Sequence, residues 1–243
     1  MGYKRKNLLL EVAIDDVFTN SYWTFDWRRA VHKASQNFRQ QFGVGFRIVE
    51  AAKWNSVGTL DLVDYPDNFI KRIPHGALPE DILDGFLKLT QECGLSINID
   101  YEEERGRFRK HLGGHYSSGY RAGFMAGWLD EWRDRCLLRD LKTQFSRDDI
   151  DVVVGFTGKK IKIEPGRSLL GGSDGEKYAI IGVYYYKIDM IIIHEVAHCL
   201  GATHCDDDQN SIMRYSLSCD TYDFDKSNKT IILKNLQDRL GCW

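Results

Sequence analysis

The chain of 243 residues lacks several features that would place it in a specialised class of protein. Its apolar run Leu8-Leu9-Leu10 stops at Glu11, and no run approaches the roughly 18 residues that a membrane span needs. It has only 4 Pro and is 43% hydrophobic, which argues against a disordered or low-complexity chain. It has 33 Lys and Arg residues and 35 Asp and Glu residues, so it lacks the excess of positive charge that is typical of nucleic-acid-binding proteins. We therefore expect a folded protein with neither a membrane span nor a nucleic-acid partner.

The cysteine pattern excludes further classes of site. None of the 6 cysteines forms a CxxC pair, so zinc-ribbon and thioredoxin-type motifs lose their main support. An even number of cysteines is compatible with disulfides, and Asn228-Lys229-Thr230 is a glycosylation sequon. These two features favour a secreted or extracellular protein, with a cytoplasmic one as the alternative. No signal peptide is recognisable, because Glu11 breaks the apolar run near the start.

Hydrophobic periodicity predicts an α/β fold. A strand over 8–17, a helix over 24–41 and a strand over 45–51 follow one another in the order of a parallel crossover. Further strands are expected over 150–156 and 178–186. The first helix should bury the apolar stripe Trp27, Ala30, Val31, Ala34 and Phe38. The pattern therefore indicates a mostly parallel sheet covered by helices.

Residues 64–148 interrupt this alternation. The interval contains a proline-punctuated loop and predicted helices over 79–92 and 119–144. No internal repeat or low-complexity tract is present. We therefore expect a single domain over 1–243 that contains a helical insertion at about 64–148.

The strongest chemical signal is the segment HEVAHCLGATH at residues 194–204. A buried apolar helix is expected there, which places His194 and His198 one turn apart on one face. Two such imidazoles can bind one ion at about 2.0–2.1 Å. Gly201 allows a left-handed turn, so the chain can fold back and offer His204 as a third ligand. Three ligands with an open fourth position are typical of a catalytic zinc site, whereas four close a structural one.

Glu195 occupies the position of a general base in this motif. It is turned about 100° around the helix axis from the first histidine, so it can contact the metal's water without binding the metal. With 7 His and 22 Gly in the chain, the five fixed positions of HExxHxxGxxH would arise by chance in roughly a few per 100,000 such sequences. That rarity disfavours the alternative of core histidines that merely pack a buried helix.

The segment resembles the metzincin zinc metalloproteases, whose signature is HExxHxxGxxH followed by a Met-containing turn. The turn is matched by Ser-Ile-Met-Arg-Tyr at 211–215, with Met213 nine residues after His204. The resemblance implies that Met213 forms the base of the site under the imidazoles. It also implies that Tyr215 has a catalytic role, as in astacins and serralysins, where this Tyr donates a hydrogen bond to the developing oxyanion.

The resemblance also implies a fold and a substrate-binding edge. A metzincin-like domain has a twisted, mostly parallel sheet, an active-site helix and a short irregular C-terminal subdomain that ends in a helix. Residues 1–204 would form the upper sheet subdomain and 205–243 the lower one with the Met-turn. An antiparallel edge strand binds the substrate backbone in this family, and its expected counterpart is Leu169, Leu170 and Gly171.

The residue after the third histidine usually marks the metzincin subfamily, and here it is Cys205. Archaemetzincins have Cys there, but followed by further cysteines, including a CxxC, that this chain lacks. The Ser-Ile-Met-x-Tyr turn is instead similar to astacins and serralysins, so the resemblance indicates the clan and not the subfamily. We expect a disulfide between Cys205 and Cys219 that closes the loop around the Met-turn. The alternative is that the cysteines are free thiols in a reducing compartment.

The sequence thus predicts a zinc-dependent endopeptidase with one catalytic Zn²⁺ held by His194, His198 and His204, and with a peptide or protein substrate. Two alternatives stay open. One is a zinc hydrolase that acts on a non-peptide amide or ester. The other is a non-catalytic zinc-binding interaction module, which the presence of Glu195 disfavours.

Overall fold

The structure is a computed structural model, which describes residues 6–15, 26–56, 137–158, 162–164, 167–168, 171–182, 187–205, 208, 210–214 and 221–241. The chain divides into two compact units. The first contains Met1–Asn55, Leu137–Lys159 and Leu169–Trp243, and the second contains Ser56–Cys136 and Lys160–Ser168. Most of the expected insertion at 64–148, with the predicted helix over 79–92, lies outside the described residues. The single-domain organisation therefore stays a prediction.

The described part of the second unit, apart from Ser56, is a short antiparallel pair of strands. These strands are β4 (Lys162–Glu164) and β5 (Arg167–Ser168). All the site residues that the sequence singled out belong to the first unit, so the first unit is described in detail below.

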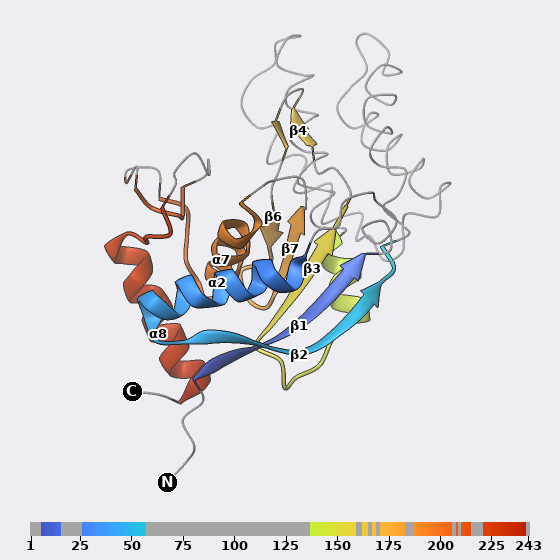
Figure 1. The fold of residues 1–243 in the computed structure, drawn as a ribbon, viewed down its shortest axis with the longest axis horizontal. Helices are drawn as coiled ribbons and strands as arrows, with labels where there is room; N and C mark the ends of the chain where they lie inside the picture. The colour runs from blue at the N-terminus through green and yellow to red at the C-terminus, as the bar shows by residue number, and fades with distance from the viewer. Residues whose placement is uncertain are drawn as a thin grey trace, which may run out of the picture. The chain divides into compact units, whose positions relative to one another are not determined.

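A five-stranded sheet in the order β2-β1-β3-β7-β6 forms the centre of the first unit. Its strands are β1 (Asn7–Asp15), β2 (Gly45–Trp54), β3 (Val152–Thr157), β6 (Gly171–Ser173) and β7 (Tyr178–Gly182). All neighbouring pairs are parallel except β6, the edge strand, which runs antiparallel to β7. The predicted mostly parallel α/β fold is therefore confirmed, and Figure 1 shows the sheet with its helices.

Two helices, α2 (Trp27–Phe42) and α7 (Ile188–Cys199), share a hydrophobic core with one face of this sheet. α2 begins after Asp26, whose side chain accepts a hydrogen bond from the backbone N–H of Arg29 at 3.1 Å. The predicted stripe of α2 is buried, as are the alternate β1 residues Leu8, Leu10 and Val12 in the same core. This confirms the amphipathic interpretation of the α2 sequence.

The opposite face of the sheet is covered by a helix at residues 137–144. Gly155 alternates with Val154 and Phe156, which belong to the core on the α2 side, so it faces the other way. A Cβ atom at Gly155 would lie 3.2 Å from the Leu141 side chain. Burial on both faces explains why β3 is apolar without alternation.

Candidate metal centre

Helix α7 is apolar around nearly its whole circumference, and every residue in it except His198 is buried. A helix of this kind belongs in a protein core or a membrane. At 12 residues α7 is too short to span a bilayer. More generally, the described helices include none that is long and apolar enough for a membrane crossing. The sheet and neighbouring helices therefore fix α7 by packing, which gives the histidines it carries a rigid support.

The structure brings His194, His198 and His204 together at one point. The Nε2 atoms of His194 and His198 are 3.1 Å apart, and those of His194 and His204 are 3.3 Å apart. The third pair, His198 and His204, is separated by 3.2 Å. Three nitrogens that each lie about 2.0–2.1 Å from one tetrahedral ion are about 3.3 Å from one another. The triad therefore fits a single ion of the size of zinc.

Backbone carbonyls orient two of the three rings. His194 Nδ1 lies 2.8 Å from the carbonyl oxygen of Ile212, and His198 Nδ1 lies 2.8 Å from that of Ala202. A carbonyl oxygen only accepts, so each Nδ1 carries the proton and donates it. In the neutral ring Nε2 then has a free lone pair. Lone pairs that converge on one point form a site for a cation.

The electrostatics of the site favour neutral imidazoles. Burial, with a smaller contribution from His198, lowers the pKa of His194 to about 3. Burial is also the main reason why the pKa of His198 is lowered from its ordinary value. Both rings are therefore neutral near pH 7, and the neutral imidazole is the form that binds metal ions.

A tight turn after α7 returns the chain to the site. Gly201 has φ 82°, its N–H donates to the carbonyl of His198 at 2.8 Å, and the N–H of Ala202 donates to that of Ala197 at 3.0 Å. This pair of bonds is the Schellman pattern, which needs a left-handed residue at the position of Gly201. The predicted left-handed turn is thus confirmed, and it places His204 beside the two helical histidines.

The predicted Met-turn contacts the triad through its backbone. Met213 is buried, and its carbonyl accepts a hydrogen bond from the N–H of Cys205 at 2.9 Å. The preceding carbonyl, that of Ile212, accepts the hydrogen bond from His194. The turn therefore touches both the helical and the loop part of the site, and the role of Met213 as the base of the site stays a prediction. Tyr215 lies outside the described residues.

Glu195 is 5% exposed and faces the antiparallel edge strand. A Cβ atom at Gly171, the first residue of β6, would lie 2.8 Å from both Cγ and Oε1 of Glu195. The absence of a side chain at this position lets the β6 backbone lie directly against the carboxylate. Gly171, the one described residue of the predicted edge segment, is thus next to Glu195, and the observed edge strand continues from it to Ser173. Its substrate-binding role stays a prediction, and Leu169 and Leu170 lie outside the described residues.

The expected disulfide is not formed. Cys205 and Cys199 are free thiols in the structure, and Cys199 is buried. The loop that the disulfide between Cys205 and Cys219 was expected to close is held instead by the backbone hydrogen bond from Cys205 to Met213. The other partner, Cys219, lies outside the described residues.

Sequence reasoning missed one group of residues at this site. Asn228, Asn235 and Arg239, all in α8 (Lys226–Leu240), donate hydrogen bonds to backbone carbonyls between Cys199 and Thr203. Their spacing of seven and four residues places them on one face of a helix. That spacing was a visible signal, but polar residues on a C-terminal helix ordinarily face solvent.

Comparison with known proteins gives a structural match and no sequence match. No protein-family model and no curated protein matches the chain. Among solved structures, 63 chains match, one of them the crystal structure of archaemetzincin from Methanopyrus kandleri. It has a TM-score of 0.50 and 14% sequence identity, over 96% of this chain and 97% of that chain. The chain therefore has a mixed α/β fold similar to that of archaemetzincin, with a histidine triad that could hold a metal ion.

Proposed function

We propose that this protein is a zinc-dependent endopeptidase of the metzincin type. The observation that carries the proposal is the convergence of the Nε2 atoms of His194, His198 and His204 within 3.1–3.3 Å of one another. The likeness to the archaemetzincin fold supports it. So does the placement of Glu195 one residue after the first ligand and against an antiparallel edge strand.

The donor set favours zinc in a catalytic coordination. Imidazole nitrogens suit zinc, and three protein ligands leave a fourth position for water or substrate. Among the described residues, the candidate group consists of the three histidines with no fourth His, Cys, Asp or Glu. A structural zinc site would normally have four protein ligands.

The chain's own residues account for the remaining steps. His194, His198 and His204 would hold the zinc ion, which would act as a Lewis acid and make water a better nucleophile near neutral pH. Glu195 accepts the proton of the attacking water on its carboxylate and passes that proton to the leaving amine. Its buried position, next to Gly171, shields the carboxylate from bulk solvent. Tyr215 donates a hydrogen bond from its hydroxyl to the developing oxyanion.

The edge strand favours a peptide over a small amide or ester. Among the described strands β6 pairs with β7 alone, so its other edge can offer backbone hydrogen bonds to an extended chain. Such β-augmentation gives affinity through main-chain bonds. We assign this binding to Leu169, Leu170 and Gly171. A non-peptide amide or ester has no comparable set of backbone groups to pair with.

The experiment that tests the proposal compares zinc-loaded wild type with Glu195→Gln on a diverse peptide library, with cleavage sites mapped by mass spectrometry. Wild type should cleave internal peptide bonds. The variant should retain zinc and cleave about 10²–10⁴-fold more slowly, because it lacks general-base assistance. A panel of non-peptide amides and esters is run in parallel.

Hydrolysis of that panel without any peptide cleavage would replace the proposal by the non-peptide hydrolase. Zinc binding with no hydrolysis of either set of substrates would support the non-catalytic module instead. Equal cleavage by wild type and Glu195→Gln would show that the general base is another residue.

A further inference from the structure

One face of α8 lies along the backbone that joins the second and third histidines. Asn228 is buried, while Asn235 and Arg239 are half-buried on the same face of the helix. The backbone segment they reach, residues 199–203, connects His198 to His204. Any change in the conformation of this segment changes the distance between two proposed metal ligands.

The contacts of this face fix the segment at three places. Asn228 binds Thr203 with both ends of its amide, since Nδ2 donates to the Thr203 carbonyl and Oδ1 accepts from the Thr203 N–H, each at 2.9 Å. Asn235 Nδ2 donates to the carbonyl of Leu200 at 2.7 Å. Arg239 Nη2 donates to the carbonyl of Cys199 at 2.6 Å. We name these three side chains the α8 clamp.

The clamp residues donate hydrogen bonds to backbone carbonyls at the end of α7 that have no partner within the helix. The last carbonyls of a helix have no partner within the helix, and those of Cys199 and Leu200 are in this position. A guanidinium there also interacts favourably with the negative end of the helix dipole. The clamp therefore stabilises the end of α7 from which the chain turns back to His204.

The same network reaches the turn whose Ile212 carbonyl accepts a hydrogen bond from His194. Asn228 Nδ2 also donates to Asp225 Oδ2 at 2.7 Å, and the same oxygen accepts from the hydroxyl of Ser211 at 2.9 Å. The oxygen of Ser211 in turn accepts from the N–H of Met213 at 3.1 Å. Burial alone would raise the pKa of Asp225, but these hydrogen bonds lower it, so the carboxylate is charged at neutral pH.

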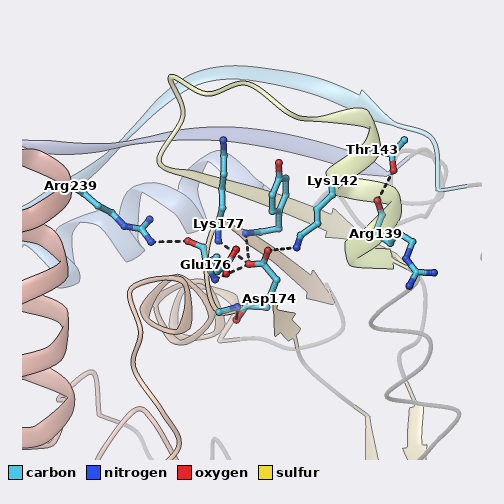
Figure 2. A network of polar contacts seen from close by, with 10 residues as sticks. Arg139, Lys142, Thr143, Asp174, Glu176, Lys177 and Arg239 are labelled. Atoms are coloured by element: carbon cyan, nitrogen blue, oxygen red, sulfur yellow. Dashed lines mark hydrogen bonds and ion pairs between the residues drawn. The ribbon is translucent and has the colours of Figure 1, made fainter. Parts of the chain in front are cut away.

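Arg239 extends the network to the edge strand. Its Nη2 donates to the carbonyl of Glu176 at 2.8 Å, in the turn between β6 and β7 (Figure 2). Asp174 organises that turn, because its Oδ1 accepts backbone hydrogen bonds from residues 176, 177 and 178 at 2.8–2.9 Å. Its other oxygen pairs with Lys142 at 2.7 Å. One guanidinium thus joins the end of α7 to the turn between β6 and β7.

We infer that the α8 clamp sets the geometry of the metal centre. Asn228, Asn235 and Arg239 are positioning residues: they touch neither metal nor substrate but hold the backbone between His198 and His204. This inference rests on the proposed function, because it assigns the three histidines to one metal ion. Loss of groups that orient metal ligands typically weakens metal binding by about 10–100-fold.

The test uses Asn235→Ala and Arg239→Ala in the full-length protein. Matched controls are Gln237→Ala and Lys234→Ala, which remove an exposed amide and an exposed cation from the same helix. Zinc affinity is measured by competition with a chelator, and hydrogen exchange of residues 199–204 is measured by mass spectrometry on the metal-free protein. Asn235→Asp, which keeps the side-chain size and removes the donor, is a second variant in case Asn235→Ala does not fold.

We expect zinc affinity to fall by about 10–100-fold in Asn235→Ala and Arg239→Ala, with faster exchange at 199–204 and no change in the two controls. Unchanged affinity in both variants would overturn the inference, even if exchange became faster. An equal loss in the controls would also overturn it, since the effect would then be a general weakening of α8. A wild-type chain that binds no zinc would overturn the proposed function, and the exchange data would still decide whether the clamp holds the segment.

Discussion

Helix α7, which carries two of the site's histidines, and helix α8, which binds the backbone that follows them, differ in burial and composition. α7 is apolar and buried, and it supplies two of the converging histidines and Glu195. α8 has exposed residues along much of its length, and of its side chains only Asn228, Ile232, Leu236 and Leu240 are buried. Yet α8 supplies the side chains that bind the carbonyls at the end of α7.

The two helices position different ligands of the proposed metal centre. The apolar packing of α7 makes the position of His194 and His198 rigid, because a close-packed interior tolerates little movement. Packing cannot fix His204, which is exposed and follows a turn. Hydrogen bonds from α8 hold the backbone that leads to it. We therefore expect mutations in α7 to abolish zinc binding and mutations in α8 to weaken it by degrees.

The largest effect should come from His198→Ala, which removes a ligand from the rigid helix. Wild type should contain close to one zinc per chain and the variant close to none, as measured by elemental analysis after purification without added metal. His32→Ala is a matched control, because His32 is exposed on α2 and contacts Gln36 there. A variant that retains wild-type zinc content would remove His198 from the metal site.

Gly171→Ala should leave zinc in place and impair hydrolysis. The added Cβ would lie 2.8 Å from the side chain of Glu195 and 2.8 Å from the Ile180 carbonyl, so the general base or the edge strand has to shift. A misplacement of about 1 Å near reacting groups can cost about 10²-fold in rate. Ser173→Ala, two residues along β6, should be close to wild type. Wild-type kcat/KM in Gly171→Ala would show that this close approach does not matter for catalysis.

Tyr215→Phe tests the role that the metzincin resemblance assigns to the end of the Met-turn. The substitution keeps the ring and removes the hydroxyl. If the hydroxyl stabilises the oxyanion, kcat should fall by roughly 10²-fold with KM and zinc content little changed. Steady-state kinetics with a peptide identified from the library would measure this. Unchanged kcat would make Tyr215 a packing residue.

The last effect, which is small near neutral pH, is a pH dependence of the stability of the metal-free protein. The pKa of His194 is about 3 in the folded protein, because the ring is buried, against an ordinary value of 6.5. Above pH 6.5 the ring is neutral in both states and contributes nothing. Below it the unfolded chain gains a proton that the folded ring does not take up, so the free energy of unfolding should fall between pH 6.5 and 3. Denaturant unfolding of wild type and His194→Gln would check this, because the variant should lose that part of the slope.

The sequence predicted α7 and the two histidines that it carries. The motif HExxHxxGxxH is local, so helix geometry alone brings His194 and His198 together, and Gly201 determines how the chain returns. The buried stripe of α2 was also predicted, because its apolar residues recur at helical spacing. The strands β1 and β3 were recognisable because continuous apolar runs are typical of buried parallel strands.

What the sequence did not predict depends on contacts between distant residues. Asn235 binds a carbonyl 35 residues away, and Arg239 binds one 40 residues away. The spacing of these residues places them on one face of a helix, but nothing in the sequence identifies the distant carbonyls that they bind. The prediction of a disulfide at Cys205 was wrong because cysteine spacing gives only possible pairs, and in the structure Cys205 is a free thiol whose backbone N–H donates to Met213.

The three histidines should hold one zinc ion together. X-ray absorption spectroscopy at the zinc edge of the zinc-loaded wild-type protein measures its ligands. We expect imidazole nitrogens from three histidines at about 2.0–2.1 Å and a light-atom ligand at the fourth position. A sulfur ligand at about 2.3 Å, which would bring Cys205 or another thiolate into the site, would contradict it. So would a spectrum with fewer than three imidazoles.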